Sequence, residues 1–512
     1  MKHSTIHHFL LTVLLFIRST SLFAQKLAPK KRLMKFPKSK IILVFLMLSL
    51  VSVTYSQDIK LYKKRKSTID SMLMEEMKNR KIPGLVYGIY GKDTLIMANA
   101  LGYADVQNMA PTRINTVFEL ASITKQFTST AIMILQQKGK LKVTDQVCNY
   151  IEDCPEAWKG ITFLHLMSHT SGLPGLYGGT GFNKQAYSGI DTMSSQRVRN
   201  RIRSWDKRFA FDAIKSDKPI TPPGEKFNYS DVGFVLLGIV IDNITGSYRN
   251  FLKENIFEPI GMHSTYILDQ QTVHPYEARG YSLKNGELIN IMRFGQNEIP
   301  SHYGIFSNVI DLQKWDEALN SNLILSDESK QIVWSANKLN NGKESNYGMG
   351  WFVLNLGKKK IISHSGVTGT EIIKLVTDEV AVCVLTNLGF NDNDRVRSWG
   401  LCHEIAKILN MDVFINKAYV EGKGMTIVPM KPNTIKYLIG DYKTKDYTLS
   451  IFLEDGKVKI KLPTGEFELV QLNTGDFIYL GANRENILKP IDPEFKQIII
   501  NDDIQGIKIK DK

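Results

Sequence analysis

Strand-like segments occur in two groups that lie far apart in this chain, with helix-like segments between them. Residues 84–90 and 94–101 read as a hairpin, and the later strand candidates are residues 347–354, 360–365, 371–377 and 380–385. Antiparallel strands supplied by both ends of a domain, with helices in the middle, are typical of a layered fold in which the two ends meet in one sheet. The sequence therefore predicts an α+β fold.

Apolar residues at helical spacing predict the helices between these groups. They are expected over residues 68–79, 122–139, 161–167, 231–245 and 309–321. The helix expected over residues 122–139 has a continuous apolar stripe, so we expect it to be buried. A serine, Ser122, opens it, and backbone N–H groups at such a helix start favour a neighbouring negative charge.

The C-terminal part has a different pattern of apolar and polar residues. From about Val428 apolar and polar residues alternate, and Asp455-Gly456 marks a tight hairpin turn between two such segments. We predict three parts: an export signal region at residues 1–56, a main domain at 57–415, and a small all-β C-terminal domain at 428–512.

Positive charge is concentrated at the N-terminus. Residues 1–56 contain nine Lys or Arg and no Asp or Glu, so only +5 of the net charge of +14 belongs to the rest of the 512 residues. That remainder is too small to indicate a nucleic-acid partner. Residues 41–53 form a short apolar segment behind three lysines, which is typical of a secretory signal. We expect export to the periplasm or the exterior, with the true signal beginning at Met34.

The alternative for this segment is an uncleaved anchor, which would then be the protein's membrane attachment. No cysteine stands directly after the apolar segment, so a lipoprotein anchor is not expected.

The four cysteines indicate no metal framework. Cys148 and Cys154 are close enough in sequence to close a small disulfide loop in an oxidising compartment, whereas Cys383 lies in an apolar run and is expected to be buried. His403 to Lys407 has lysine where the helical zinc motif needs its second histidine. We expect neither a metal nor another cofactor.

Three short motifs together indicate acyl-transfer chemistry. Ser122-Ile123-Thr124-Lys125 places a hydroxyl and an amine on one helix face, where a lysine of depressed pKa accepts the hydroxyl proton. Tyr229-Ser230-Asp231 and His364-Ser365-Gly366 supply further proton-transfer and binding groups. Each motif alone is a weak signal, but the ordered set is specific.

With their flanking residues, these motifs resemble the serine beta-lactamase and penicillin-binding-protein superfamily, in particular its class C beta-lactamase, D-alanyl-D-alanine carboxypeptidase and esterase branch. The resemblance covers about residues 82–388 and rests on residues 118–125, 161–174, 223–234, 347–351 and 364–366. It implies a beta-lactamase-like antiparallel sheet flanked by helices, a helical subdomain, and a serine hydrolase domain at residues 57–415.

The resemblance also implies residue roles. Ser122 would be the acylated nucleophile, Lys125 its proton partner, and Tyr229 the residue that shares the base role and protonates the leaving group. The substrate-binding residues would be Asp231, His364, Ser365, Gly366 and Val367, and the backbone N–H groups of Ser122 and Val367 would form the oxyanion hole.

Two positions depart from the family's pattern. Asp231 stands where asparagine is usual, and an ionised carboxylate cannot donate a hydrogen bond and would stabilise the ammonium form of Lys125. We expect that Asp231 turns away, or is protonated, or leaves more of the proton transfer to Tyr229; a simple place in the first turn of its helix is the alternative. His364 replaces a common lysine, which would make carboxylate recognition depend on imidazole protonation.

Two other features suggest a function but are better explained by a structural role. His169 near Ser171 suggests a second nucleophile and base, but residues so close in a turn seldom face each other, so we favour structural bracing. The long segment 176–223 suggests a lid or binding surface, and its basic run between Arg199 and Arg208 is best read as one solvated helix face.

The leading hypothesis is an exported serine hydrolase that acts through an acyl-enzyme on a small ester, amide or peptide. Alternatives are a D-amino-acid peptidase, carboxypeptidase or beta-lactamase, and, from another class, a non-turnover acyl-binding sensor or pseudoenzyme. The expected partner is a small-molecule or peptide substrate, and the sequence does not predict an oligomeric state.

Overall fold

The computed structural model describes the following residues: 63–175, 211–212, 214–268, 272–291, 300–356, 359–389, 400–409, 411, 427–445, 447–454, 456–462, 465–481, 484–500 and 504–510. The chain divides into two compact units, Met1–Thr68 and Ile69–Lys512. The helix predicted over 68–79 is present over residues 63–80, with Ile69 and Leu73 fully buried. The predicted export region and the basic run lie outside the described residues, as does most of the predicted lid.

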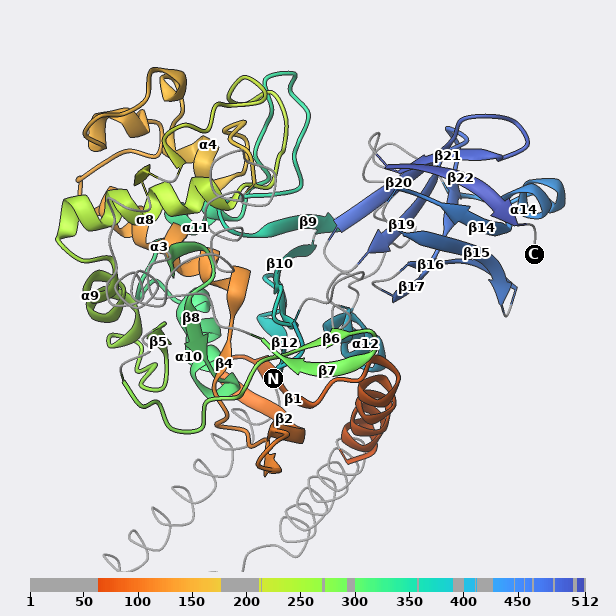
Figure 1. The fold of residues 1–512 in the computed structure, drawn as a ribbon, viewed down its shortest axis with the longest axis horizontal. Coiled ribbons are helices and arrows are strands. Elements are labelled where there is room, and N and C mark those ends of the chain that lie inside the picture. Colours follow the sequence, from red (N-terminus) through yellow and green to blue (C-terminus); the bar gives the residue numbers. More distant parts are fainter. Residues whose placement is uncertain are drawn as a thin grey trace, which may run out of the picture. The chain divides into compact units, whose positions relative to one another are not determined.

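A seven-stranded antiparallel sheet organises the larger domain, in the order β3-β2-β1-β12-β11-β10-β9 (Figure 1). β1 pairs with β12 from Leu85 opposite Thr386 to Gly91 opposite Val380, so the two ends of the domain meet at the middle of the sheet as predicted. The strands are β1 Gly84–Gly91, β2 Thr94–Asp105, β3 Ala110–Pro111, β9 Phe352–Leu356, β10 Lys359–Gly366, β11 Thr370–Leu375 and β12 Val380–Thr386.

The strand predicted over residues 347–354 is wrong in its first half. β9 starts only at Phe352, because Gly350 has a φ of +77° and turns the chain just before it. A Cβ on Gly350 would lie 2.7 Å from the Lys125 carbonyl oxygen, so this turn passes directly against the helix that follows Ser122.

Helices fill the middle of the sequence as predicted. α8 ends at Gly246, whose φ of +83° gives the left-handed position expected of a helix-terminating glycine. The α-helices are α3 Thr124–Gln137, α4 Phe163–Met167, α8 Asp231–Thr245, α9 Tyr248–Leu252, α10 Val309–Asn320, α11 Asp327–Val333 and α12 Leu401–Ile408. Shorter turns are the 3-10 segments η1 Ala121–Ile123, η2 Val147–Tyr150, η3 Glu156–Trp158 and η5 Pro300–His302, and the π-helical segment η4 Lys253–Phe257.

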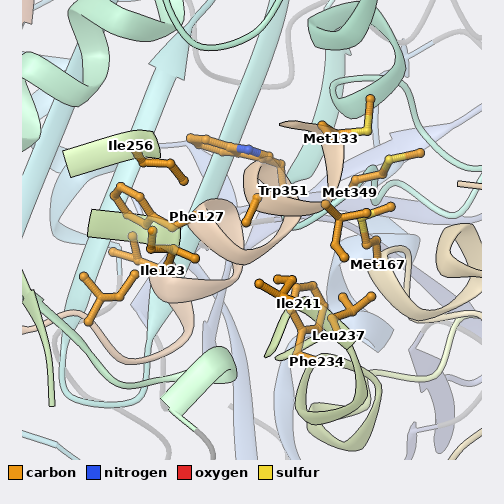
Figure 2. Close-up of a cluster of buried hydrophobic side chains, with 14 of the residues drawn as sticks. Ile123, Phe127, Met133, Met167, Phe234, Leu237, Ile241, Ile256, Met349 and Trp351 are labelled. Atoms are coloured by element: carbon orange, nitrogen blue, oxygen red, sulfur yellow. The ribbon is translucent and has the colours of Figure 1, made fainter. Parts of the chain in front are cut away.

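The main core lies around α3 and α8. Figure 2 shows Phe127 and Met133 of α3 and Phe234, Leu237 and Ile241 of α8 among the side chains of this cluster. Trp351 and Met349 extend the cluster from the turn before β9, and Met167 extends it from α4. Twelve of the fourteen residues of α3, from Thr124 to Leu135, are buried, which confirms the predicted buried helix.

Two small sheets complete the larger domain. The three-stranded sheet β4-β8-β5 consists of β4 Phe118–Glu119, β8 Ile305–Ser307 and β5 Tyr266–Ile267, and β4 leads directly into the segment that holds Ser122. β6 Tyr281–Lys284 and β7 Glu287–Asn290 form a two-stranded sheet.

The C-terminal residues form a ten-stranded antiparallel sheet, in the order β13-β18-β19-β20-β21-β22-β14-β15-β16-β17, drawn in blue in Figure 1. The predicted hairpin is present, with Glu454 of β15 opposite Lys457 of β16. One helix, α14 Pro432–Leu438, accompanies the strands. The strands are β13 Ile427–Val428, β14 Gly440–Lys443, β15 Thr448–Glu454, β16 Lys457–Leu462, β17 Gly465–Glu468, β18 Val470–Leu472, β19 Phe477–Gly481, β20 Arg484–Pro490, β21 Gln497–Ile500 and β22 Ile504–Lys510.

The cysteines behave as the sequence suggests. Cys148 and Cys154 form a disulfide across a six-residue separation, and Cys383 and Cys402 are buried free thiols. No single helix of the described residues is long and apolar enough to span a membrane; only α8 with the following segment to Phe257, bent by 86°, passes that test as a pair.

Candidate active site

Ser122 lies in a strained turn between β4 and α3. The sequence placed it at the start of an α-helix, but the structure has it in the 3-10 segment η1, with α3 beginning two residues later. Ala121 has a φ of +47°, which is unusual for a residue with a Cβ and is the kind of strain that a surrounding fold must hold in place. Backbone bonding from Leu120 to Ile305 fixes this turn to β8, and Ser122 is 9% exposed.

Lys125 is fully buried and points at the Ser122 hydroxyl. Its Nζ is 3.0 Å from Ser122 Oγ, 2.9 Å from the His302 carbonyl oxygen and 2.7 Å from Asp231 Oδ1. An ammonium group has three protons, and three oxygens lie within 3.0 Å. Burial alone lowers the Lys125 pKa, but Asp231 and Tyr229 outweigh it and raise the pKa above the ordinary lysine value. The amine is therefore held as an ammonium.

Asp231 faces Lys125 from the first turn of α8. Ser230 caps this helix, its hydroxyl accepting from the Gly233 N–H, and the Asp231 side chain is 13% exposed. Burial raises the Asp231 pKa, but Lys125 and then His302 lower it, and the net pKa is below the ordinary aspartate value. Of the arrangements expected from the sequence, Asp231 neither turns away nor stays protonated. It is an ionised carboxylate paired with Lys125.

Tyr229 lies over Lys125, and its loop is held by His169. The Lys125 Nζ is 5.0 Å from the centroid of the Tyr229 ring, and the Tyr229 hydroxyl interacts with both Lys125 and Ser122. Burial raises the Tyr229 pKa above the ordinary tyrosine value, although Lys125 opposes this, so the phenol is neutral. The backbone N–H groups on either side of Tyr229 donate to His169, that of Asn228 to its carbonyl oxygen (2.8 Å) and that of Ser230 to its Nδ1 (3.1 Å).

His169 is a brace for this loop, as the sequence indicated. Its ring is tilted 32° from that of Tyr229, with the centroids 4.1 Å apart. Burial, followed by Lys125, lowers the His169 pKa well below the ordinary value, which keeps Nδ1 available as an acceptor. Ser171 makes no bond to His169; its Oγ accepts from the Leu173 N–H at 3.3 Å.

β10 brings His364 to the same site, but without a charge. His364 Nδ1 donates to the Ser365 carbonyl oxygen at 2.9 Å, and Nε2 is 2.9 Å from the Tyr347 hydroxyl. Burial, followed by Lys125, lowers the His364 pKa to about 3, and burial raises the Tyr347 pKa well above the ordinary value. The neutral imidazole therefore accepts from Tyr347. Carboxylate recognition was expected to depend on His364 protonation, and near neutral pH this imidazole has no charge to offer.

The end of β10 is clamped to the segment before Ser122. A Cβ on Gly366 would lie 2.4 Å from the Leu120 carbonyl oxygen, so only glycine allows this approach. Beyond it, the Thr368 hydroxyl donates to the Glu119 carbonyl (2.7 Å) and the Thr370 hydroxyl to that of Leu120 (2.9 Å). The turn that contains Val367 is thus held against the turn that contains Ser122, the two sources of the predicted oxyanion hole.

Two contributors were missed from the sequence. The His302 carbonyl oxygen is a Lys125 acceptor from η5, and no sequence signal marks a main-chain oxygen. Tyr347 binds His364, and its place in the Tyr347 to Trp351 motif was the available signal. In the described part of the chain, no group of three or more His, Cys, Asp or Glu side chains is arranged to hold a metal ion.

A family model and a known relative match this chain. The family model "Beta-lactamase" matches residues 69–407. A penicillin-binding protein of Bacillus subtilis (strain 168) is 30% identical over 298 residues, which are 55% of this chain and 62% of that protein, so this chain spans less than two thirds of that relative.

Two solved structures share the fold. The octameric penicillin-binding protein homologue from Pyrococcus abyssi aligns with a TM-score of 0.56 at 24% identity, over 86% of this chain and 99% of that chain. EstCE1, a hydrolase with promiscuous acyltransferase activity, aligns with a TM-score of 0.56 at 20% identity, over 69% of this chain and 98% of that chain. The fold expected from the sequence motifs is confirmed.

Proposed function

Because this chain belongs to the Beta-lactamase family, we propose that it is a serine hydrolase that forms an acyl-enzyme on Ser122 and acts on a small ester, amide or peptide. The observation that supports this most directly is the 3.0 Å contact between the Ser122 hydroxyl and a buried lysine that is itself paired with a carboxylate. Lys125 is fully buried, and its contact with the Ser122 hydroxyl puts a proton-transfer group against the candidate nucleophile.

The proposed acylation step begins with attack of Ser122 Oγ on the substrate carbonyl carbon. The hydroxyl proton moves to Lys125 Nζ while one ammonium proton moves from Nζ to Asp231 Oδ1, 2.7 Å away. Lys125 thus acts as a relay and Asp231 as the group that takes up the proton, which resolves how an ammonium and a neutral phenol activate a serine. The N–H groups of Ser122 and Val367 stabilise the oxyanion.

The leaving group then takes the Tyr229 phenol proton as its bond to the carbonyl carbon breaks. Tyr229 regains a proton from Lys125, and Asp231 returns its proton to Lys125, so the site recovers its starting charges. Water attacks the acyl carbon by the same route in reverse, and the acid product leaves with Ser122 free. We also infer that residues 34–56 direct export, since they combine a basic start with a short apolar segment.

An acylating probe tests the assignment. Wild-type protein is expected to be labelled once by a fluorophosphonate and to hydrolyse p-nitrophenyl acetate, whereas Ser122→Ala should lose both. Ser129→Ala is the matched control, because Ser129 is a buried serine of α3 whose hydroxyl has no hydrogen-bond partner among the described residues. Labelling of Ser122→Ala would refute the nucleophile.

Mass spectrometry separates turnover from mere capture. The acetyl adduct on Ser122 is expected to form and then disappear as substrate is exhausted. An adduct that persists without hydrolysis would favour the acyl-binding sensor instead.

A further inference from the structure

The carboxylate of Asp231 has one oxygen that the catalytic machinery does not use. Oδ1 is 2.7 Å from Lys125 Nζ, but Oδ2 has no hydrogen-bond partner in the described part of the chain. Lys125 is fully buried, whereas the Asp231 side chain is 13% exposed, so Asp231 is the more accessible member of the pair. Two hydrogen-bond lengths at most separate Oδ1 from Ser122 Oγ, because both contact the same Nζ.

Neither Lys125 nor His364 has a positive charge that is available to a substrate anion beside Ser122. The ammonium of Lys125 is occupied by its three oxygen neighbours. His364 is neutral, with one ring nitrogen bonded to Ser365 and the other to Tyr347. Among Asp231, Lys125 and His364, a substrate therefore meets a negatively charged hydrogen-bond acceptor and no free cation.

We propose that Asp231 Oδ2 binds an ammonium group on the acyl part of the substrate, so that the site selects amino-acyl compounds over carboxylate-bearing ones. This inference rests on the proposed function and adds its substrate class. A chain with asparagine at this position presents an amide, which has no net charge; here the departure to aspartate replaces it with an anion. An ammonium at Oδ2 gains a charge-assisted hydrogen bond, and a carboxylate there is repelled.

The proposed proton relay predicts which kinetic parameter shows this selectivity. A cation on Oδ2 binds the substrate but also makes the carboxylate less basic toward the proton that it receives from Lys125. The preference for an ammonium is therefore expected in KM and not in kcat. Lys125, His302 and His169 lower the Asp231 pKa, and Tyr229, Tyr347 and His364 are the other titratable groups that interact with this carboxylate.

Three isosteric p-nitroanilides give the test, at about pH 7, where an α-amino group is mostly protonated and an ordinary histidine is mostly neutral. The alanyl compound carries an ammonium, the isobutyryl compound a methyl group in its place, and the methylmalonyl compound a carboxylate. For wild type we expect kcat/KM to fall in that order, by about tenfold at each step. Compounds that are not turned over are compared as inhibitors of p-nitrophenyl acetate hydrolysis, with the same order expected.

Asp231 variants identify the group responsible. Asp231→Asn should remove the ordering, and Asp231→Glu, which keeps the charge, should retain part of it. The ratio between substrates is the readout, since both variants also alter the proton relay. Equal values for the three compounds in wild type, or a preference for the carboxylate, would overturn the inference and leave Ser122-dependent ester hydrolysis intact. Loss of that Ser122 dependence would instead overturn the proposed function.

Discussion

Two lysine–aspartate ion pairs in this protein have the same N–O distance but differ in how far their side chains are exposed. Lys125 with Asp231 and Lys374 with Asp316 both have N–O distances of 2.7 Å. The second pair joins β11 to α10. The Lys374 and Asp316 side chains are only 1% and 2% exposed, whereas the Asp231 side chain is 13% exposed. Burial raises the Asp316 pKa in spite of Lys374, but the Asp231 pKa is lowered.

The difference shows that a buried ion pair is not by itself evidence of chemistry. Asp316 meets one cation, while Asp231 meets Lys125 with His302 beside it, and Lys125 also contacts a serine hydroxyl. The Lys374–Asp316 pair makes no contact with a serine hydroxyl in the described residues, and it joins a strand to a helix. In the proposed mechanism, the Lys125–Asp231 pair holds a proton donor and a proton acceptor beside the Ser122 hydroxyl.

Removing the two lysines gives the largest expected contrast. Lys125→Met should lower kcat/KM for p-nitrophenyl acetate on the order of 10³-fold, because both the relay and the hydrogen bond to Ser122 are lost. Lys374→Met should keep the activity of each folded molecule but lower the free energy of unfolding by about 3–5 kcal/mol, because it leaves Asp316 buried without its partner. Active-site titration and denaturant unfolding measure the two effects.

A double variant separates charge burial from general damage at the second pair. Lys374→Met combined with Asp316→Leu removes both charges and should recover most of the stability lost in Lys374→Met. A loss of activity in this double variant comparable to that of Lys125→Met would contradict the distinction between the pairs.

The two aspartates are distinguished by pH dependence. In wild type the active form has ionised Asp231 and protonated Lys125, so kcat/KM should be flat from above about pH 4 to the alkaline region, given the lowered and raised pKa values. Asp231→Asn removes the proton acceptor and the main cause that raises the Lys125 pKa, so that burial lowers this pKa against Tyr229 alone. Activity should then drop about a hundredfold at pH 6 and rise with pH as the free amine appears.

Asp316→Asn is the control for this profile, and it should leave the shape of the pH curve unchanged. If Asp231→Asn were faster than wild type at neutral pH, the lysine alone would be the base, and Asp231 would only hold it in the ammonium form. Such a result would remove the relay from the mechanism.

The sequence identified the members of the site better than their states. The closeness of Ser122 and Lys125 was predictable because a three-residue spacing is a local property, and the α+β fold followed from strands at both ends of the domain. The ionisation states of Asp231 and His364 could not be predicted from the sequence, because they depend on burial and on neighbours from other elements. The His302 carbonyl oxygen reaches Lys125 across 177 residues, which no spacing rule anticipates.

Substitution of His169 is expected to have the smallest effect on activity. It tests how accurately Tyr229 must be positioned beside the Lys125–Asp231 pair. His169→Leu removes the acceptor for the Ser230 N–H and should lower kcat about tenfold by loosening Tyr229, with little change in KM. His169→Asn should recover part of that loss, because asparagine supplies an acceptor oxygen and tolerates the φ of +58° at this position. In a Tyr229→Phe background His169→Leu should cost little more, since the hydroxyl it positions is already gone. An equal loss in both backgrounds would mean that His169 only supports folding.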